Sequence, residues 1–594
     1  MNGLLRPAHI GVTVIALTAA APALVLPNAA ARADFDEDTR ICTGGGGGPD
    51  NRIAACTRQI ESGRWQGHNL AVIYNNRGIA YVDKGEPDRA IEDYNRTIAL
   101  DPALILGYNN RGNAYNDKHD YDRAIADYSA ALKIDPKFVP ALNARGFAYF
   151  SKGDLDRAFA DYNQALALDA KFEFAYTNRA IAYNAKGEFD RAIADYSQAL
   201  ALDPKDFAAC NGRGNAYVNK GELDRAIADF GEAIKIAPKH ALAYNGRGNA
   251  YVNKGDNDRA IADYGQAIAL DPKYVIAYNG RGNAYLNKTD NNRAIADYNQ
   301  AIALDPKYVF AYNGLGNALL NKRDYDRAIA AYGQAITLAP RYAAAYHNRG
   351  LAYAGKGDLD RAVADYNQAI TLDPKYVAAY TNRGNALFDK KDFDHAIADY
   401  NQVIALDPKQ FSAYYNRGNA YKGKGDYSHA MADYGEFITH DPNNAVVRFA
   451  RGRLELAAGA LPGALADLNA VIALAPKNAY AALWLDITNR RANQPSRLAE
   501  AAKQLDMTRW PAPAVRLYLG ELSADAALAI ANNADAASKK PLVCEVSFFI
   551  GELDLQSGKK DDATRLFHQA SDGCPDYLFT YDAAIAELRA LAVP

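Results

Sequence analysis

Arginine and aspartate recur in this sequence sixteen residues apart, which gives a charge pattern that could either bind anions or form internal ion pairs. The arginines are Arg77, Arg111, Arg145, Arg179, Arg213, Arg247, Arg281, Arg349, Arg383, Arg417 and Arg451. The aspartates are Asp93, Asp127, Asp161, Asp195, Asp229, Asp263, Asp297, Asp365, Asp399, Asp433 and Asp467. In one place Leu315 and Ala331 replace both members together. Because a guanidinium on a packed helix needs a carboxylate partner, the joint loss favours an Arg–Asp bridge between two helices over an anion site.

Asparagine occupies three positions, four residues apart, in each of four consecutive segments. These residues are Asn211, Asn215, Asn219, Asn245, Asn249, Asn253, Asn279, Asn283, Asn287, Asn313, Asn317 and Asn321. A spacing of four places each trio along one helix face, although asparagine is a mediocre helix former. An amide both donates and accepts hydrogen bonds, so such a face suits the main chain of an extended peptide. The alternative is that duplication of nearly identical segments copied one pattern four times.

The elements that position these residues follow a 34-residue period. Proline marks the period at Pro102, Pro136, Pro204, Pro238, Pro272, Pro306, Pro340, Pro374, Pro408, Pro442 and Pro476, with Ala170 in the one remaining slot. Twelve units therefore run over residues 71–478 without insertion or deletion. A period of 34 predicts helix–turn–helix units stacked in a line.

One unit, residues 241–272, shows how the hairpin is encoded. Small and aromatic residues alternate on one face of each predicted helix, at Tyr244, Gly248, Tyr251, Ala260, Tyr264 and Ala267. Gly248 costs roughly 1 kcal/mol in a helix, and its recurrence indicates a close contact between helices. Gly255 is placed to end the first helix and Asp256 to cap the second.

Those six small and aromatic residues, together with Pro272, resemble the signature of the tetratricopeptide-repeat (TPR) family, and the resemblance covers about 70% of the chain. The resemblance implies an all-α fold, a right-handed α-solenoid of helix hairpins with degenerate N- and C-terminal caps. It also implies a concave groove, lined by positions 2, 5, 9, 12 and 13 of each first helix, which binds other proteins. We expect this inner face to be uncovered. The chain departs from the family in placing Arg, rather than Leu, before the recurring glycine.

The two ends of the repeat array differ from its middle. Residues 34–70 look like a degenerate N-terminal cap with a Gly-rich loop, and Cys42 and Cys56 flank the glycines. Residues 479–543 form a divergent helical segment, and residues 544–594 restart the repeat as a C-terminal cap. Antiparallel helices bring Cys544 and Cys574 together, so we expect disulfides at both ends in an oxidising compartment. Cys210 stays as a buried free thiol, with a reactive role as the alternative.

The C-terminal block also resembles NlpI-type periplasmic TPR adaptors of Gram-negative bacteria, through residues 510–518, 544–555 and 563–581. That resemblance implies an exported scaffold for a cell-wall protease and its peptidoglycan-hydrolase clients. The chain departs from the type in carrying more repeats and no lipid-attachment cysteine.

Residues 1–33 have the pattern of a secretory signal peptide. Arg6 precedes an apolar run over residues 11–26, and Ala31-Arg32-Ala33 gives a small-x-small cleavage pattern before Asp34. We expect cleavage after Ala33 and a periplasmic or secreted protein whose mature chain has no integral membrane segment.

Composition argues against several other classes of function. The 67 basic and 70 acidic residues nearly cancel, without the basic stripe that nucleic acid requires. No zinc-ligand pair, phosphate loop, dinucleotide fingerprint or nucleophile elbow occurs in the sequence, so we expect no catalytic residue, metal or cofactor. His347 and His395 are predicted on solvated repeat surfaces. The sequence therefore predicts a non-enzymatic scaffold or adaptor of the bacterial cell envelope that binds extended polypeptide segments. The alternative is a structural component of an envelope assembly or polysaccharide export machine.

Overall fold

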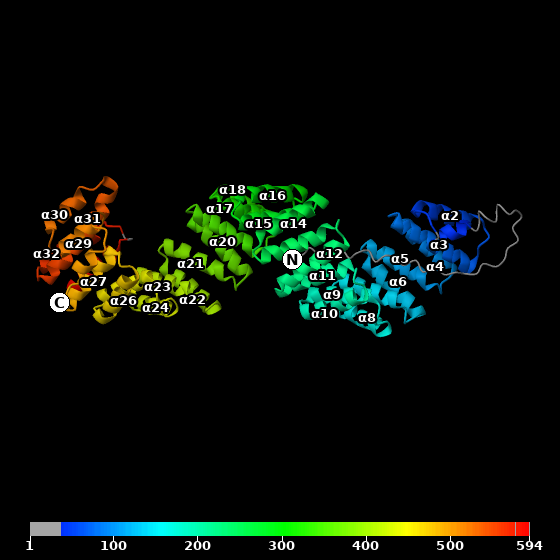
Figure 1. Ribbon diagram of the computed structural model, residues 1–594, viewed down its shortest axis with the longest axis horizontal. Coiled ribbons are helices and arrows are strands. Elements are labelled where there is room, and N and C mark those ends of the chain that lie inside the picture. Colours follow the sequence, from blue (N-terminus) through cyan, green and yellow to red (C-terminus); the bar gives the residue numbers. More distant parts are fainter. Residues whose placement is uncertain (1–36, 45, 576–577, 593–594) are drawn as a thin grey trace. The chain divides into compact units, whose positions relative to one another are not determined.

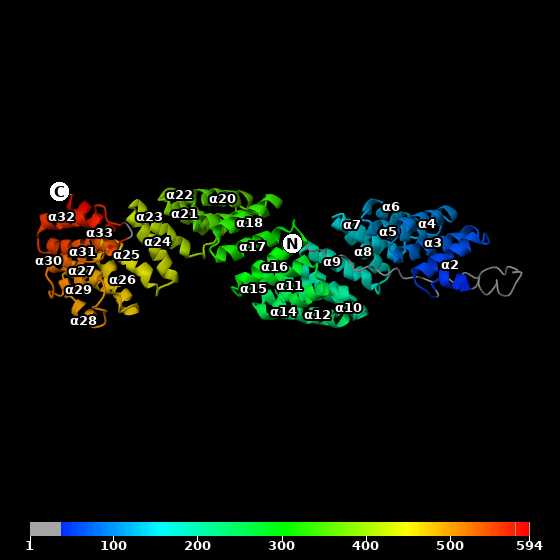
Figure 2. The same ribbon diagram turned by 90° about the horizontal axis from the view of Figure 1, so that it is seen from above.

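The computed structural model describes residues 37–44, 46–575 and 578–592, which form helices joined by turns and no strand. The predicted signal peptide lies outside the described residues. The chain divides into two compact units, up to Ala318 and from Leu319 onward, with the division inside helix α17 (Val309–Asn321). Within each unit, consecutive helices pair as hairpins that follow one another in chain order (Figures 1 and 2). The all-α prediction is confirmed for the described residues.

Each of the twelve 34-residue units contains two helices, and in eleven of them the two helices pack together as a hairpin within one compact unit. The first helices are α3 (Gly67–Asp83), α5 (Ile105–Asp117), α7 (Val139–Ser151), α9 (Glu173–Lys186), α11 (Phe207–Lys220), α13 (Ala241–Asn253), α15 (Val275–Asn287), α17, α19 (Ala343–Gly355), α21 (Val377–Asp389), α23 (Ser412–Lys424) and α25 (Ala445–Ala457). The second helices are α4 (Pro87–Leu100), α6 (Tyr121–Ile134), α8 (Leu155–Leu168), α10 (Phe189–Leu202), α12 (Leu223–Ile236), α14 (Asn257–Leu270), α16 (Asn291–Leu304), α18 (Tyr325–Leu338), α20 (Leu359–Leu372), α22 (Phe393–Leu406), α24 (Tyr427–His440) and α26 (Leu461–Leu474).

The turn between α13 and α14 is set by two residues. Gly255 adopts φ 84°, in the left-handed region where glycine carries no steric penalty, and so ends α13. The Asp256 side chain then accepts a hydrogen bond from the Arg259 backbone N–H at 3.1 Å and caps α14. The two signals predicted from the sequence therefore both operate.

The recurring mid-helix glycine makes room for a buried ring. Tyr264 of α14 is fully buried, and a Cβ added at Gly248 would lie 2.9 Å from its Cε1 atom. A Cβ added at Gly280 of the next unit would lie 2.6 Å from the same atom. The ring is thus held between two helices whose backbones approach closely, which explains why the glycine recurs.

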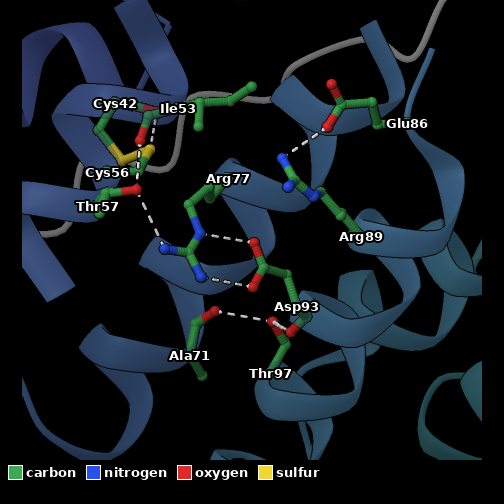
Figure 3. A network of polar contacts seen from close by, with 10 residues as sticks. All are labelled: Cys42, Ile53, Cys56, Thr57, Ala71, Arg77, Glu86, Arg89, Asp93 and Thr97. Carbon is green, nitrogen blue, oxygen red and sulfur yellow. Dashed lines mark hydrogen bonds and ion pairs between the residues drawn. A yellow bond between two sulfur atoms is a disulfide. The ribbon is translucent and has the colours of Figure 1, made fainter. Parts of the chain in front are cut away.

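The N-terminal cap consists mainly of α2 (Pro49–Glu61), which packs against α3. The Sγ atoms of Cys42 and Cys56 lie 2.09 Å apart, at the distance of a disulfide bond (Figure 3). Helix α3 begins at Gly67, four residues before the expected start of the first unit at residue 71.

The C-terminal region builds one large core instead of a series of small ones. It contains α27 (Ala479–Arg491), α28 (Leu498–Ala502), α29 (Ala512–Tyr518), α30 (Ala524–Asn532), α31 (Ala536–Gln556), α32 (Lys560–Ser571) and α33 (Phe579–Leu591). Trp484, Phe548 and Phe567 lie in this core and are almost fully buried. The Sγ atoms of Cys544 and Cys574 lie 1.94 Å apart. Helix α31 begins at Ala536, eight residues before the expected restart of the repeat at residue 544. Among the described residues, no helix is both long enough and apolar enough to cross a membrane.

Candidate interaction surface

The Arg–Asp pattern forms a ladder of internal ion pairs. In the sixth unit, Arg247 Nε and Nη2 donate to the two carboxylate oxygens of Asp263 at 2.7 and 2.8 Å. All eleven predicted pairs have an N–O separation of 2.5 to 2.8 Å. The carboxylates are buried, and the hydrogen bonds that Arg247 donates to Asp263 raise the pKa of Arg247. The predicted structural ladder is confirmed, and its guanidinium groups are engaged by these carboxylates.

Seven of the ladder arginines also bond a side chain of the preceding hairpin or of α2. The other four, Arg247, Arg281, Arg349 and Arg451, have a glycine sixteen residues earlier. Arg77 Nη1 donates to Thr57 Oγ1 of α2 at 3.1 Å, while its other nitrogens bind Asp93 (Figure 3). Arg111 and Arg179 make the equivalent bond to Asn95 and Asn163, each at 2.6 Å. Sequence reasoning missed this link between repeats. The signal was an Asn or Ser sixteen residues before the arginine, at Asn95, Ser129, Asn163, Ser197, Asn367 and Asn401.

The asparagine trios lie on first helices, with exposure increasing along each helix. The first member is the most enclosed, and Asn211 and Asn245 are only 2% and 7% exposed. The second members are half-buried or exposed, and the third members are exposed. In α17, Asn313 and Asn317 are half-buried and Asn321 is exposed.

The first members form a row of hydrogen-bond acceptors that the described protein atoms leave unmet. No side chain or backbone group in the described residues donates to the buried Oδ1 atom of Asn211, Asn245 or Asn279. These residues occupy the fifth position of α11, α13 and α15, and α13 contacts both of the other helices directly. A buried acceptor without a donor costs about 1–3 kcal/mol, so each of these carbonyls destabilises its repeat until a donor reaches it.

The same position is paired in two earlier units, whereas Asn109 on α5 also has an unmet Oδ1 atom. Asn110 Nδ2 donates to Asn75 Oδ1 at 3.0 Å, and Asn178 Nδ2 donates to Asn143 Oδ1 at 3.0 Å. We call such a bond, from the sixth position of one unit to the fifth of the unit before, a latch.

Glycine removes the latch around the acceptor row. The unit that follows Asn211 has Gly246 at its sixth position. In the same way Gly280 follows Asn245, and Gly314 follows Asn279. A Cβ at each would lie 2.4 to 2.6 Å from the buried ring of Phe230, Tyr264 or Tyr298. Close ring packing therefore leaves no donor side chain for the three carbonyls.

The second members of the trios have a structural role. Tyr264 donates its hydroxyl to Asn249 Oδ1 at 2.6 Å, and Tyr298 donates to Asn283 Oδ1 at 2.7 Å. Phe230 replaces the tyrosine beside Asn215 and has no hydroxyl to donate. The third members can bond between helices, since Asn219 donates to Asn184 at 3.3 Å.

A second stretch of inner face, on α23, α25 and α27, is covered by the chain's own last helix. Helix α33 packs against α25, α31 and α32 (Figure 2). Its Asp582 forms an ion pair with Lys422 at 2.8 Å. The expectation of a wholly uncovered inner face is therefore wrong in the second unit. The sequence pattern gave no signal of this contact, because residues 479–591 depart from the repeat period that links neighbouring positions.

Other residues singled out in the sequence have ordinary structural surroundings. Cys210 is buried and unpaired, and burial raises the pKa of its thiol to about 11, away from reactivity at neutral pH. His347 was predicted to be solvated, which is wrong, because it is 7% exposed and accepts from Asn382 Nδ2 at 2.9 Å. His395 is exposed and bonds Asp392. The described residues contain no group of His, Cys, Asp and Glu arranged to hold a metal ion.

Stacked helix hairpins whose first helices contact those of the neighbouring hairpins define the class of α-solenoid scaffolds. Sequence comparison identifies the family within this class. A TPR-repeat model matches residues 112–153, 146–187, 182–221, 214–255, 248–288, 290–323 and 384–425. Two further tetratricopeptide-repeat models match residues 313–377 and 415–479, and residues 71–104. Together they cover residues 71–479 apart from 105–111, 289 and 378–383. The chain belongs to the tetratricopeptide-repeat family.

Several solved structures are similar to parts of the chain. The Cut9–Hcn1 hetero-tetramer of the APC/C matches at 15% identity over 73% of this chain and 99% of that one, with a TM-score of 0.37. A tetratricopeptide repeat protein from Parabacteroides merdae matches at 23% identity over 42% and 98%, with a TM-score of 0.35. Yeast Tom70 matches at 17% identity over 62% and 91%, with a TM-score of 0.35. No curated protein matches the sequence.

Proposed function

We propose that this protein is a non-enzymatic scaffold of the bacterial cell envelope that binds an extended polypeptide segment across α11, α13 and α15. The observation that carries the proposal is the row of unmet carbonyl acceptors at Asn211, Asn245 and Asn279. The donors that an extended polypeptide supplies at regular intervals are its backbone N–H groups. Because the asparagine carbonyls would accept from backbone N–H groups of the ligand, we expect the site to bind peptides of many different sequences.

Helix spacing bounds the length of the ligand. Neighbouring packed helices lie about 8–10 Å apart, and an extended chain advances about 3.3 Å per residue. About three residues of ligand would therefore pass each repeat, and a segment of about ten residues would span the row.

The main test uses backbone chemistry. A panel of labelled, unstructured ten-residue peptides of mixed polar and apolar sequence is titrated against the mature protein by fluorescence anisotropy. For each peptide that binds, three versions are made in which every third backbone nitrogen is N-methylated, starting at the first, second or third residue. One of these three versions should lose binding. Binding should also be lost in the triple variant Asn211→Ala/Asn245→Ala/Asn279→Ala.

The matched control is Asn143→Ala, which removes an acceptor that Asn178 already uses. This variant should leave peptide affinity unchanged. Binding that survives both N-methylation and the triple substitution, or a panel without any binder, would contradict the proposal.

The cellular location belongs to the same proposal. It is supported by the signal pattern of residues 1–33 and by two cysteine pairs at disulfide distance, since disulfides persist outside the reducing cytosol. The resemblance of the C-terminal block to NlpI-type adaptors favours the periplasm and a role in bringing envelope enzymes together. Cell fractionation followed by N-terminal sequencing should find a chain that starts at Asp34. A cytoplasmic chain that retains residues 1–33 would overturn this part.

A further inference from the structure

We propose that the inner face of α23, α25 and α27 is a binding site for an acidic amphipathic helix, and that α33 is its resident ligand, which a partner helix must displace. This site lies in the second compact unit and is independent of the acceptor row on α11, α13 and α15.

The contacts of α33 with the repeats fall on the positions of the first helices that line the inner face. Phe449 and Arg453 are positions 5 and 9 of α25, and Lys422 is position 12 of its unit on α23. On α27, the same numbering makes Tyr480 position 2 and Arg491 position 13. Helix α33 therefore binds where a groove ligand would bind.

An aromatic residue anchors the start of α33. The ring of Phe579 packs edge-on against Phe449 and Tyr480, with centroids 5.5 and 5.7 Å apart. The Arg453 guanidinium lies 4.6 Å from the same ring centroid and donates from Nη1 to the Phe579 carbonyl oxygen at 2.9 Å. Such aromatic and cation–π contacts favour an aromatic side chain at this place in any ligand.

Two carboxylates fix the rest of the helix. Asp582 pairs with Lys422 at 2.8 Å, and Glu587 pairs with Arg491 at 2.8 Å. The site thus presents three cations, Lys422, Arg453 and Arg491, to a helix that carries an aromatic residue followed by acids three and eight positions later. This complementarity of charge defines the partner as an acidic helix.

The resident helix leaves part of the site unsatisfied. The Nε atom of Arg453 and the Nε1 atom of Trp484 are buried donors without a partner among the described residues, and Arg453 lies 5.7 Å from the Trp484 ring. Two unmet donors at one place are a cost that a ligand with a further carboxylate would remove. A partner helix can therefore bind more tightly than α33 does.

The test is competition with the resident helix in the full mature chain. The probe is a labelled synthetic peptide of residues 578–592, titrated against wild type and against Phe579→Ala/Asp582→Asn. If α33 is docked more than nine-tenths of the time, the peptide should bind the variant at least tenfold more tightly than wild type. Adding Lys422→Glu to the variant should cancel this gain in peptide affinity, because Asp582 of the peptide then meets a carboxylate instead of an ammonium group.

Equal affinity for wild type and variant, or a gain that survives Lys422→Glu, would overturn the proposal. Circular dichroism checks that each variant keeps its helices. A second measurement needs no variant, because saturating peptide should raise hydrogen exchange over residues 579–591 of the wild-type protein. Unchanged exchange at saturation would equally overturn the proposal.

Discussion

The inner faces of α11–α15 and of α23–α27 use the same helix positions in opposite ways. In the first stretch the fifth position is asparagine, and its buried carbonyls at Asn211, Asn245 and Asn279 lack a protein donor among the described residues. In the second stretch aromatic and cationic residues lie at the inner-face positions, with Phe449 at the fifth position of α25, and α33 covers them. The comparison teaches that a groove position is not functional by register alone. What matters is whether the fold satisfies the side chain from within.

Removing Arg491 should have the largest effect and should be confined to the covered stretch. Arg491 lies between Glu552 and Glu587, at 2.7 and 2.8 Å, so Arg491→Ala leaves buried carboxylates without a cation. We expect a loss of about 3–5 kcal/mol in the free energy of unfolding of this region. Urea titration followed by Trp484 and Trp510 fluorescence, in a Trp65→Phe background, measures it.

The control for that variant is Arg259→Ala, which breaks an exposed pair with Asp256 in the uncovered stretch. It should leave the urea midpoint unchanged. If the two variants have equal effects, the contrast between the covered and the uncovered stretch fails.

The covered stretch should also lose stability as pH rises. Burial raises the pKa of Glu552 to about 7, opposed by Arg491 and reinforced by Glu587, and Tyr518 also faces this group. Because the folded pKa lies above the unfolded value of 4.5, the stabilisation is fully present below about pH 4.5 and is lost as pH rises through about 7. The loss should be on the order of 2–3 kcal/mol.

Unfolding free energies of this region at pH 6, 7 and 8 give the slope directly. In Glu552→Gln the slope between pH 6 and 8 should vanish. A slope that persists in this variant assigns the pH dependence to another group.

A latch introduced at the acceptor row should satisfy the carbonyl of Asn245 from within the protein. Gly280→Asn places at the sixth position the residue that latches the preceding unit at Asn110 and Asn178. The added Cβ would lie 2.6 Å from the Tyr264 ring, so the ring must shift and the variant should lose some stability. Once the ring has shifted, the amide would donate to Asn245 and remove one acceptor, so affinity for extended peptides should fall about tenfold, or ~1.4 kcal/mol. Fluorescence anisotropy with the same peptide panel measures the change, and Asn143→Ala again serves as the unaffected control.

The smallest effect should come from the second row of asparagines. Tyr264→Phe removes the hydroxyl that donates to Asn249, which should cost ~1 kcal/mol of unfolding free energy. The chain offers the reverse substitution, since Phe230→Tyr would give Asn215 the same donor. A gain from Phe230→Tyr together with a loss from Tyr264→Phe identifies this row as structural. If both substitutions instead change peptide affinity and leave stability unaltered, the row belongs to the ligand site.

Much of the repeat architecture was readable because its determinants are local and copied. The spacing of sixteen residues between Arg247 and Asp263 lies within one hairpin, so the joint loss at Leu315 and Ala331 was enough to predict the pairing. The same reasoning explained Gly248, whose missing side chain admits the ring of Tyr264. It failed for His347, because the pattern of a first helix cannot show that Asn382 and the ring of Tyr376 enclose this side chain.

By itself the sequence determined the hairpins, their ion-pair ladder and the candidate asparagine face, since each depends on spacings that lie within one repeat. Only the tertiary structure decided which asparagines are satisfied and which are not. That distinction depends on the side chain that the following unit presents, a glycine at Gly280 but an amide at Asn178. The structure alone also showed that α33 returns to α25, because a contact between Phe449 and Phe579 joins segments whose separation follows no period in the chain.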